Sequence, residues 1–393
     1  MSHRVAVTGI GVVSSAGIGK EAYFKSCSRG LSGIKKCGLF PTEKLATDLF
    51  GEIDEGDFPP LCECPAGENR VKALMRPAVE EMMRDSEMDR AAIASYGPDL
   101  QLCFGTLVAI SDGIAGYTAR GKPAGWLEHV NDYLPWLRDF CGAEGGCWVS
   151  SAACAAGTTA TGMAFDFIRN GLCRACIVGG ADPLTESAAV GFHVLNALSG
   201  GMCNPYDEAR DGINIGEGAA FFFFERLEDA LRRHAYIYGE ILGYGLTNDA
   251  YHITAPDPEG AAVARAMEDA VRDAGLNFSD VDHVNGHGTG TVINDQMELD
   301  AIDSASGGRK PSATSTKALI GHCMGASGAL ELAAVLLAIE NEVYMPLPNL
   351  SHPVKTGVHI ASRPYPCKIG IALSNSFAFA GNIASVLVGR YDG

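Results

Sequence analysis

The stretch 150-SSAACAAGTTATG-162 holds one cysteine, Cys154, in a run of thirteen small, uncharged residues. The apolar segment 147–150 before it and the helical pattern that continues to residue 168 predict a strand, a tight turn and a helix in that order. The dipole at the start of such a helix favours the thiolate form of a cysteine and its nucleophilicity. The alternative is a cysteine that only fills a small-residue core.

A second stretch, 312-SATSTKALIGHCMGASGALELAAVLLAI-339, has the same pattern of a strand followed by a small-residue helix. If Cys154 is laid over His322, Gly157 falls on Gly325, and the two helices continue in step. The sequence therefore predicts a duplicated unit in which a thiol and an imidazole face each other across a pseudo-dyad. We place the halves at residues 1–235 and 236–393, sharing one core.

Apolar runs that begin at residues 5, 102, 175 and 219, and again at 239, 282 and 368, alternate with helical segments. Continuous apolar strands between helices are typical of α/β layers whose sheets are buried on both faces. The segment 111–146, which contains Trp126 and Trp136, is expected to be an excursion between strands.

The composition excludes several classes of protein. With 393 residues and 47% hydrophobic residues the chain can bury a large core, and its net charge of −17 argues against binding to nucleic acid. The N-terminus lacks a signal-peptide pattern, and no uninterrupted apolar run is long enough to span a membrane. We therefore expect a cytoplasmic protein whose thirteen cysteines stay reduced.

The segment 282-DHVNGHGTGTVINDQMELDAI-302 supplies the first partner for Cys154. His287 follows a predicted strand among glycines, which permit the backbone to approach a ligand closely. Hydroxyl and carboxyl side chains follow it at Thr289, Thr291, Asp295 and Glu298. His283 and His287 have the spacing of a helical metal site, but the glycines make a helix improbable there, so no metal is expected.

Lys317 and His322 supply the second group of partners, because His322 directly precedes the second small-residue helix. A buried structural histidine remains the alternative for either imidazole alone. Two close cysteine pairs, Cys173 with Cys176 and Cys62 with Cys64, are rival zinc or redox sites. Their positions favour a structural role.

The chain resembles the β-ketoacyl synthase family of condensing enzymes almost from end to end. The resemblance rests on VTGIGVVSSAG, SAACAAG, GGAD, NPYDEARDGINIGEGAA, NDAYHITAPDPEG, NGHGTGTVINDQME, STKALIGHCMGASGALE and SNSFAFAGN. It implies a thiolase fold, in which duplicated βαβαβαββ halves form a five-layered αβαβα architecture. It also implies an enzyme without an intrinsic cofactor, whose substrates are carried on the phosphopantetheine of acyl carrier protein.

By this resemblance Cys154 takes up an acyl chain, and His287 and His322 stabilise the enolate formed when malonyl carrier protein loses CO2. Lys317, Asp295 and Glu298 are expected to order the site around the histidines. The backbone N–H groups of Cys154 and Phe379 are expected to form the oxyanion hole. Side chains implied to line the pantetheine channel are Thr254, Thr289 and Thr291.

The segment 374-SNSFAFAG-381 departs from the family pattern SNSFGFGG, because Ala378 and Ala380 replace glycines. Alanine has fewer backbone conformations than glycine, so we expect the gate around Phe379 to be stiffer or differently posed.

The expected partners are acyl carrier protein and a second synthase-like chain, in a homodimer or in a heterodimer with a chain-length-factor-like paralogue. Asn204 stands where an arginine is common in the family, so docking falls to a predicted basic patch or, because the chain is so acidic, to a basic companion subunit. The members of the patch are Arg70, Lys72, Arg76, Arg120 and Lys122.

Three functions remain open at this stage. The first is an elongating ketosynthase of fatty-acid or polyketide/polyene synthesis, with a slight preference for polyketide/polyene. The second is a non-catalytic chain-length factor, which the presence of Cys154 with both histidines disfavours. The third is a coenzyme A-dependent thiolase, which normally has a second catalytic cysteine near the C-terminus, where this chain has only Cys367 before the last strands.

Overall fold

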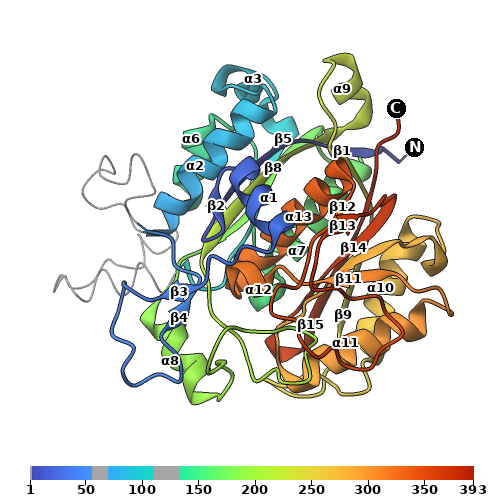
Figure 1. Ribbon diagram of the computed structural model, residues 1–393. Helices are drawn as coiled ribbons and strands as arrows, with labels where there is room; N and C mark the ends of the chain where they lie inside the picture. Colours follow the sequence, from blue (N-terminus) through green and yellow to red (C-terminus); the bar gives the residue numbers. More distant parts are fainter. Residues whose placement is uncertain (1, 55–69, 110–132) are drawn as a thin grey trace.

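The computed structural model describes residues 2–54, 70–109 and 133–393 (Figure 1). Cys62, Cys64, Arg120, Lys122 and most of the predicted excursion at 111–146, including Trp126, lie outside these residues. The described part of the excursion contains α6 (Tyr133–Cys141).

The strands of the main sheet are β1 (Val5–Ser14), β2 (Gly17–Ile18), β5 (Leu100–Gly105), β6 (Cys147–Ser150), β7 (Ala175–Asp182), β8 (Gly218–Arg226), β9 (Gly239–Asn248), β10 (His283–Asn285), β11 (Ser312–Thr314), β14 (Ile371–Phe377) and β15 (Asn382–Gly389). Two small ribbons are formed by β3 (Lys35–Lys36) with β4 (Leu49–Phe50) and by β12 (Val343–Tyr344) with β13 (Tyr365–Pro366).

The α-helices are α1 (Lys20–Arg29), α2 (Arg70–Asp85), α3 (Arg90–Ala94), α6, α7 (Ala156–Arg169), α8 (Glu186–Val194), α9 (Leu227–Arg232), α10 (Ala261–Asp273), α11 (Val292–Ala305), α12 (Lys317–Ile320) and α13 (Ser327–Asn341). Short 3-10 turns are η3 (Gly97–Asp99), η4 (Ala153–Ala155), η5 (Phe278–Asp280), η6 (Met324–Ala326) and η7 (Phe379–Gly381).

The two halves have the same strand order. The first half runs β1-β8-β7-β5-β6 and the second runs β9-β15-β14-β10-β11, with the same sequence of antiparallel and parallel neighbours in each. The halves join where Val5–Val7 of β1 pairs with Gly239–Ile241 of β9, so the main sheet is continuous across them.

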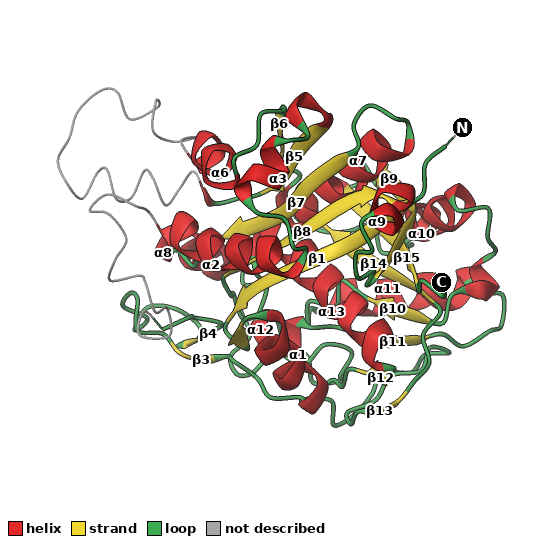
Figure 2. Ribbon diagram, turned by 90° about the horizontal axis from the view of Figure 1, so that it is seen from above, coloured by secondary structure: helices red, strands yellow, loops and turns green. Residues whose placement is uncertain are grey.

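Helices form layers on both faces of this arrangement (Figure 2). The central helices α7 and α13 contact each other and both halves of the sheet, while α2 covers β1 and β8, and α10 covers β9 and β15. The run 221-FFFF-224 shows why the sequence folds this way. Phe222 and Phe224 join the central core, and Phe221 and Phe223 join the core under α2, so β8 is apolar on both faces.

The central helix α13 is the most apolar helix of the chain's described part. The stretch Met324–Asn341 is long and apolar enough to cross a membrane by composition, yet 89% of it is buried inside the protein. Its contacts with α7 and with strands of both halves account for its apolarity.

The pseudo-dyad relates the two central helices, but with a register that differs from the predicted one. Ala153 and Met324 both have left-handed backbone, with φ of 49° and 51°, and each begins a 3-10 turn that leads directly into α7 or α13. Cys154 is therefore equivalent to Gly325 and not to His322. The predicted overlay was wrong by three residues, because the shared feature is a backbone conformation that the residue types do not reveal.

Glycines allow the two helices to meet. A Cβ at Gly157 would lie 2.8 Å from the Gly325 carbonyl oxygen, and a Cβ at Gly328 would lie 2.7 Å from the Thr158 nitrogen. The small residues around Cys154 thus serve close helix packing as well as the site.

Candidate active site

A cavity of about 400 Å³ opens where the turns that precede α7 and α13 meet the end of α8 and the loops that follow β9, β10 and β14. Seven of the residues predicted to act together line it: Cys154, Thr254, His287, Thr289, Thr291, His322 and Phe379. They come from both halves of the chain.

Cys154 lies in η4, just before α7, and its side chain is buried. Burial raises the pKa of its thiol to about 12, and the positive charge of Lys317 opposes this only in part. The helix dipole was expected to favour the thiolate, but the largest influence on this pKa is desolvation of the charged form, which acts in the opposite direction. Cys154 is a protonated thiol at neutral pH.

His322 is held in one tautomer. Its Nδ1 accepts hydrogen bonds from the backbone N–H of Met324 and from the Ser327 hydroxyl, each at 3.1 Å. The remaining proton is therefore assigned to Nε2. Burial, followed by the charge of Lys317, lowers the pKa of His322 well below its usual value, so the ring is neutral.

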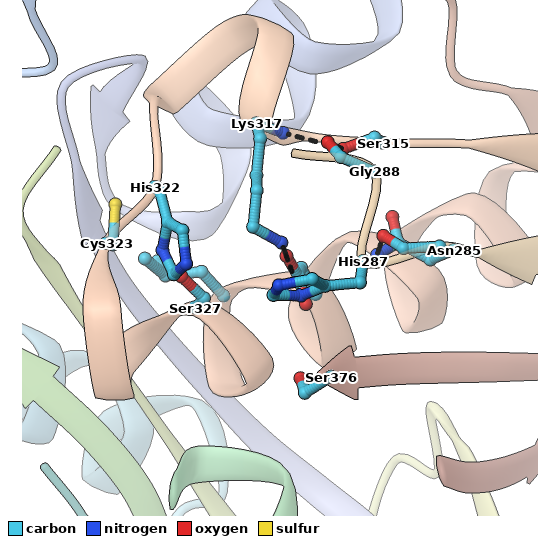
Figure 3. Close-up of polar contacts among 12 residues, drawn as sticks. Asn285, His287, Gly288, Ser315, Lys317, His322, Cys323, Ser327 and Ser376 are labelled. Carbon is cyan, nitrogen blue, oxygen red and sulfur yellow. Dashed lines mark hydrogen bonds and ion pairs between the residues drawn. The ribbon is translucent and has the colours of Figure 1, made fainter. Parts of the chain in front are cut away.

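His287 is held in the same tautomer as His322, but its Nδ1 is bonded by a different group. The Lys317 ammonium donates to its Nδ1 at 3.3 Å, which again assigns the proton to Nε2. Burial, with the charge of Lys317 and the neighbouring His322, lowers its pKa well below the usual value. Its ring centroid is 5.5 Å from that of His322, and Figure 3 shows the Lys317 side chain extending toward His287. The site therefore holds two neutral imidazoles that each keep one N–H to donate.

Lys317 itself is buried behind the histidines and does not line the cavity. It forms an ion pair with Glu331 of α13, which is also buried. This pairing offsets the cost of placing an ammonium in the core. Lys317 orients His287 from the side away from the cavity.

Asp295 and Glu298 hold the loop that presents His287. Glu298 accepts the N–H groups of His287 and Gly288 at 2.7 and 2.8 Å, and Asp295 accepts the Gly290 N–H at 3.2 Å. Gly288 and Gly290 have φ of 34° and 82°, which is why glycine occupies both positions. The hydroxyls of Thr289 and Thr291 lie 3.0 Å apart at the cavity wall.

The gate residue Phe379 stacks on Phe192 of α8 at a centroid distance of 5.5 Å, and Phe192 in turn lies 6.4 Å from the His322 ring. Ala380 has φ of 60°, a left-handed conformation that costs an alanine energy. Its N–H donates to the Ile253 carbonyl at 2.9 Å. Ala378, by contrast, is extended. The two alanines that replace family glycines are therefore in different backbone states.

Three functional residues were missed from the sequence. Glu331 neutralises Lys317, and Ser327 helps to fix the tautomer of His322. Asp182, at the end of β7, accepts hydrogen bonds from the N–H groups of Leu107, Val108, Ala109 and Gly325 and from the Thr106 hydroxyl. Asp182 thus ties the turn after His322 to the first half, and burial raises its pKa to about 6. The sequence held a signal for two of them: Glu331 is an acid within an apolar helical pattern, and Asp182 is an acid at the end of an apolar strand.

The rival cysteine pair at residues 173 and 176 is not part of a larger ligand cluster, and the other pair lies outside the described residues. Sγ atoms of Cys173 and Cys176 lie 3.4 Å apart in the core, away from the cavity, and the described residues contain no group of three potential metal ligands. His283 is bonded to Ser312 at 2.8 Å. Within the described lining of the cavity, Cys154 is the one cysteine, and Cys367 lies elsewhere.

The predicted docking patch is contradicted at two of its described members. Lys72 is buried, and Arg70 donates two hydrogen bonds to the buried carboxylate of Glu217, with a third to the Ile53 carbonyl. Arg76 lies over the rings of Trp136 and Phe140. Arg70 and Lys72 therefore do not offer an exposed basic surface.

Comparisons with known proteins agree with this geometry. The family model described as "Beta-ketoacyl synthase, N-terminal domain" matches residues 2–230, and the model described as "Beta-ketoacyl synthase, C-terminal domain" matches residues 238–351. The chain belongs to the β-ketoacyl synthase family. The predicted family, the thiolase-type fold and the condensing-enzyme class are thereby confirmed.

Curated relatives include two proteins named 3-oxoacyl-[acyl-carrier-protein] synthase 2. The protein from Rhizobium meliloti is 34% identical over 99% of both chains, and that from Synechocystis is 31% identical over 99% of this chain and 98% of the relative. Among solved structures, the ishigamide ketosynthase/chain length factor is 30% identical, with a TM-score of 0.88 and full coverage of both chains. A type II polyketide synthase acyl carrier protein in complex with its ketosynthase gives 26% identity and a TM-score of 0.89, also with full coverage.

Proposed function

We propose that this β-ketoacyl synthase joins a Cys154-bound acyl chain to the two-carbon unit of a malonyl thioester, with loss of CO2, and releases a 3-oxoacyl thioester. The observation that carries the proposal is one cavity lined by a thiol and by two neutral imidazoles whose Nδ1 atoms are both occupied as acceptors. Such imidazoles donate a hydrogen bond and are poor bases, which suits the stabilisation of a developing oxyanion.

In the first step the Cys154 sulfur attacks the acyl thioester carbonyl. A C–S bond to Cys154 forms, the bond to the carrier sulfur breaks, and the thiol proton is transferred to the departing carrier thiolate. Because the pKa of Cys154 is about 12, the proton leaves during the attack and not beforehand. Both thioesters have similar energy, so the exchange needs no external reagent.

In the second step the malonyl thioester loses CO2, and the electron pair passes into an enolate. The Nε2–H groups of His287 and His322 would hydrogen-bond its oxygen, with Lys317 holding the His287 tautomer from behind. The enolate carbon then attacks the acyl-Cys154 carbonyl. The C–S bond breaks, and Cys154 regains a proton from solvent.

The tetrahedral oxyanions of both transfers would lie against the backbone N–H groups of Cys154 and Phe379, both of which border the cavity. Thr254, Thr289 and Thr291 line the same cavity and would hydrogen-bond a phosphopantetheine arm. That arm belongs to the carrier protein, so the enzyme itself would need no resident cofactor.

We assign the enzyme to polyketide- or polyene-type synthesis in preference to fatty-acid synthesis, with a chain-length-factor-like paralogue as its partner in a heterodimer. Support comes from the 30% identity to the ishigamide ketosynthase/chain length factor and from the altered gate at Ala378 and Ala380. Efficient extension of saturated acyl carriers by the purified chain alone would contradict this assignment and leave fatty-acid synthesis.

The test of the chemistry is a covalent adduct. Incubation with an acyl-pantetheine thioester should add one acyl mass to the protein, and peptide mass spectrometry should place it on Cys154. A Cys154→Ala variant is the matched control and should stay unmodified. An adduct on another cysteine, or none on the unmodified protein, would contradict the proposed role.

A further inference from the structure

Asn214 carries a fully buried amide in the segment that joins α8 to β8. The side-chain oxygen accepts the backbone N–H of Cys203 at 2.7 Å. The side-chain nitrogen donates to the carbonyl oxygens of Leu49 and Gly201 at 3.2 and 2.9 Å. Because one partner is a donor and two are acceptors, the network also assigns the orientation of the amide. A single side chain therefore ties β4 and the loop that contains Gly201 to the segment before β8.

The main chain of His322 is bonded to the same segment. Its N–H donates to the Asn214 carbonyl oxygen at 2.7 Å, and its carbonyl oxygen accepts the N–H of Gly216 at 3.0 Å. The two bonds form a parallel β-bridge. The ring of His322 is fixed separately, through the bonds to Nδ1. The location of the imidazole in the cavity therefore depends on where Asn214 and Gly216 hold the main chain.

A second connection leads from Asn214 toward His287. Cys203, whose N–H is held by the Asn214 side chain, donates through its thiol to the Lys317 carbonyl oxygen at 3.2 Å. Lys317 in turn donates to Nδ1 of His287. Cys203 and Lys317 are both buried, like Asn214 itself. The amide is thus connected to the main chain of one catalytic histidine and to the lysine that orients the other.

A merely space-filling role does not account for this residue. An amide costs free energy to desolvate, and an apolar side chain of similar volume could occupy the same space. Buried polar groups whose hydrogen bonds are all formed give a core one fixed arrangement of the segments that they join. Here the joined segments are those that support His322 and Lys317. Asn214 is not among the described residues that line the cavity, so it acts without touching the substrate.

We infer that Asn214 is a positioning residue for decarboxylation: its side chain fixes the carbonyl group that holds the His322 main chain, and hence the point from which His322 donates to the enolate oxygen. The inference rests on the proposed function.

The two chemical steps should respond differently to loss of this amide. Decarboxylation uses the Nε2–H of His322, and a small displacement of that donor weakens the stabilisation of the enolate. Acylation uses the Cys154 thiol and backbone N–H groups instead, and none of the hydrogen bonds of Asn214 named above involves Cys154. A positioning role therefore predicts a loss confined to decarboxylation, whereas a general disturbance of the fold would slow both steps.

The experiment measures both steps on the same preparations of Asn214→Val and Asn214→Asp. Valine removes all three side-chain bonds, whereas aspartate keeps the shape and the acceptor for Cys203 but lacks the amide donors. The kcat for CO2 release from malonyl-pantetheine should fall about tenfold with valine and about threefold or more with aspartate. KM should change less than about twofold, because Asn214 does not line the cavity. The rate of acyl adduct formation on Cys154 should also change less than about twofold.

Thr8→Val is the matched control for loss of a buried hydrogen bond. Thr8 of β1 is buried, and its hydroxyl donates to Glu225 of β8 at 2.6 Å. This variant should lower the midpoint of urea denaturation and leave the ratio of decarboxylation to acylation unchanged.

A ratio of decarboxylation to acylation equal to that of the unmodified enzyme, in either folded Asn214 variant, would overturn the inference. A fall of the same size in Thr8→Val would do so as well. If Asn214→Val does not fold, Asn214→Asp decides by the same ratio. Absence of CO2 release by the unmodified enzyme would instead contradict the proposed function.

Discussion

The turns that begin α7 and α13 have the same backbone and carry different chemistry. Each starts with a left-handed residue, Ala153 or Met324, and each leads into a helix that packs against the other through a glycine. The first turn presents the Cys154 thiol. The second has Gly325 at that position. Its backbone N–H groups donate hydrogen bonds, from Met324 to the His322 Nδ1 and from Gly325 to the Asp182 carboxylate.

The difference shows how a duplicated fold can divide a reaction. One copy of the turn carries the covalent intermediate, and the other has become a support for a hydrogen-bond donor. The same contrast holds for the loops after the equivalent strands. Residues 183–217 join β7 to β8 and include α8, whereas residues 378–381 join β14 to β15 and form the gate.

The largest effect should come from removing the nucleophile of the first turn while the second turn stays unchanged. Cys154→Gln removes the nucleophile and leaves His287 and His322 in place, so condensation should fall about 10³-fold or more while malonyl decarboxylation persists or rises. Radiolabelled CO2 release and 3-oxoacyl product are measured on the same sample. His322→Ala is the complementary variant and should lose decarboxylation. If Cys154→Gln lost decarboxylation as well, the division between the turns would be wrong.

The pH dependence of Cys154 should differ from that of a cysteine activated by a helix dipole. Because its pKa is about 12, the thiolate fraction rises about tenfold per pH unit throughout the range below that value. Alkylation by iodoacetamide should therefore accelerate from pH 6 to 9 without a plateau. Lys317→Met should slow it further, since Lys317 lowers this pKa. A plateau near neutral pH would show that the dipole prevails over burial.

Adding a methyl group at the glycine contact between α7 and α13 should destabilise the protein to a similar extent from either helix. A Cβ at Gly328 would approach Thr158 Oγ1 to 2.1 Å, and one at Gly157 would meet the Ala329 nitrogen at 2.9 Å. Gly328→Ala and Gly157→Ala should each lower the free energy of unfolding by about 1–3 kcal/mol in urea denaturation. Gly191→Ala is the control, because nothing lies within 4 Å of its Cβ. A loss for only one of the pair would mean that the contact is not symmetric.

Much of this site could be predicted from the sequence, because its reactive residues follow strands in turns of glycine and other small residues. That pattern located Cys154, His287 and His322. The pseudo-dyad register could not be predicted, since Ala153 and Met324 share only a dihedral angle. The protonation state of Cys154 and the ion pair of Lys317 with Glu331 depend on burial by distant segments. Arg70 was predicted to belong to a basic patch, because its ion pair with Glu217, far along the chain, cannot be seen in the sequence.

The smallest predicted effect concerns the gate at residues 378–381, whose equivalent in the first half is the much longer connection of residues 183–217. Ala380 is left-handed and should gain from glycine, whereas Ala378 is extended and should not. Ala380→Gly should raise the free energy of unfolding by about 0.5–1 kcal/mol through relief of strain. Ala378→Gly should lower it by about 0.4–1 kcal/mol through greater freedom of the unfolded chain. Urea denaturation of the two variants side by side measures the difference. Equal effects would show that the backbone at Ala380 is not strained, and that the gate differs from the family pattern only in side-chain volume.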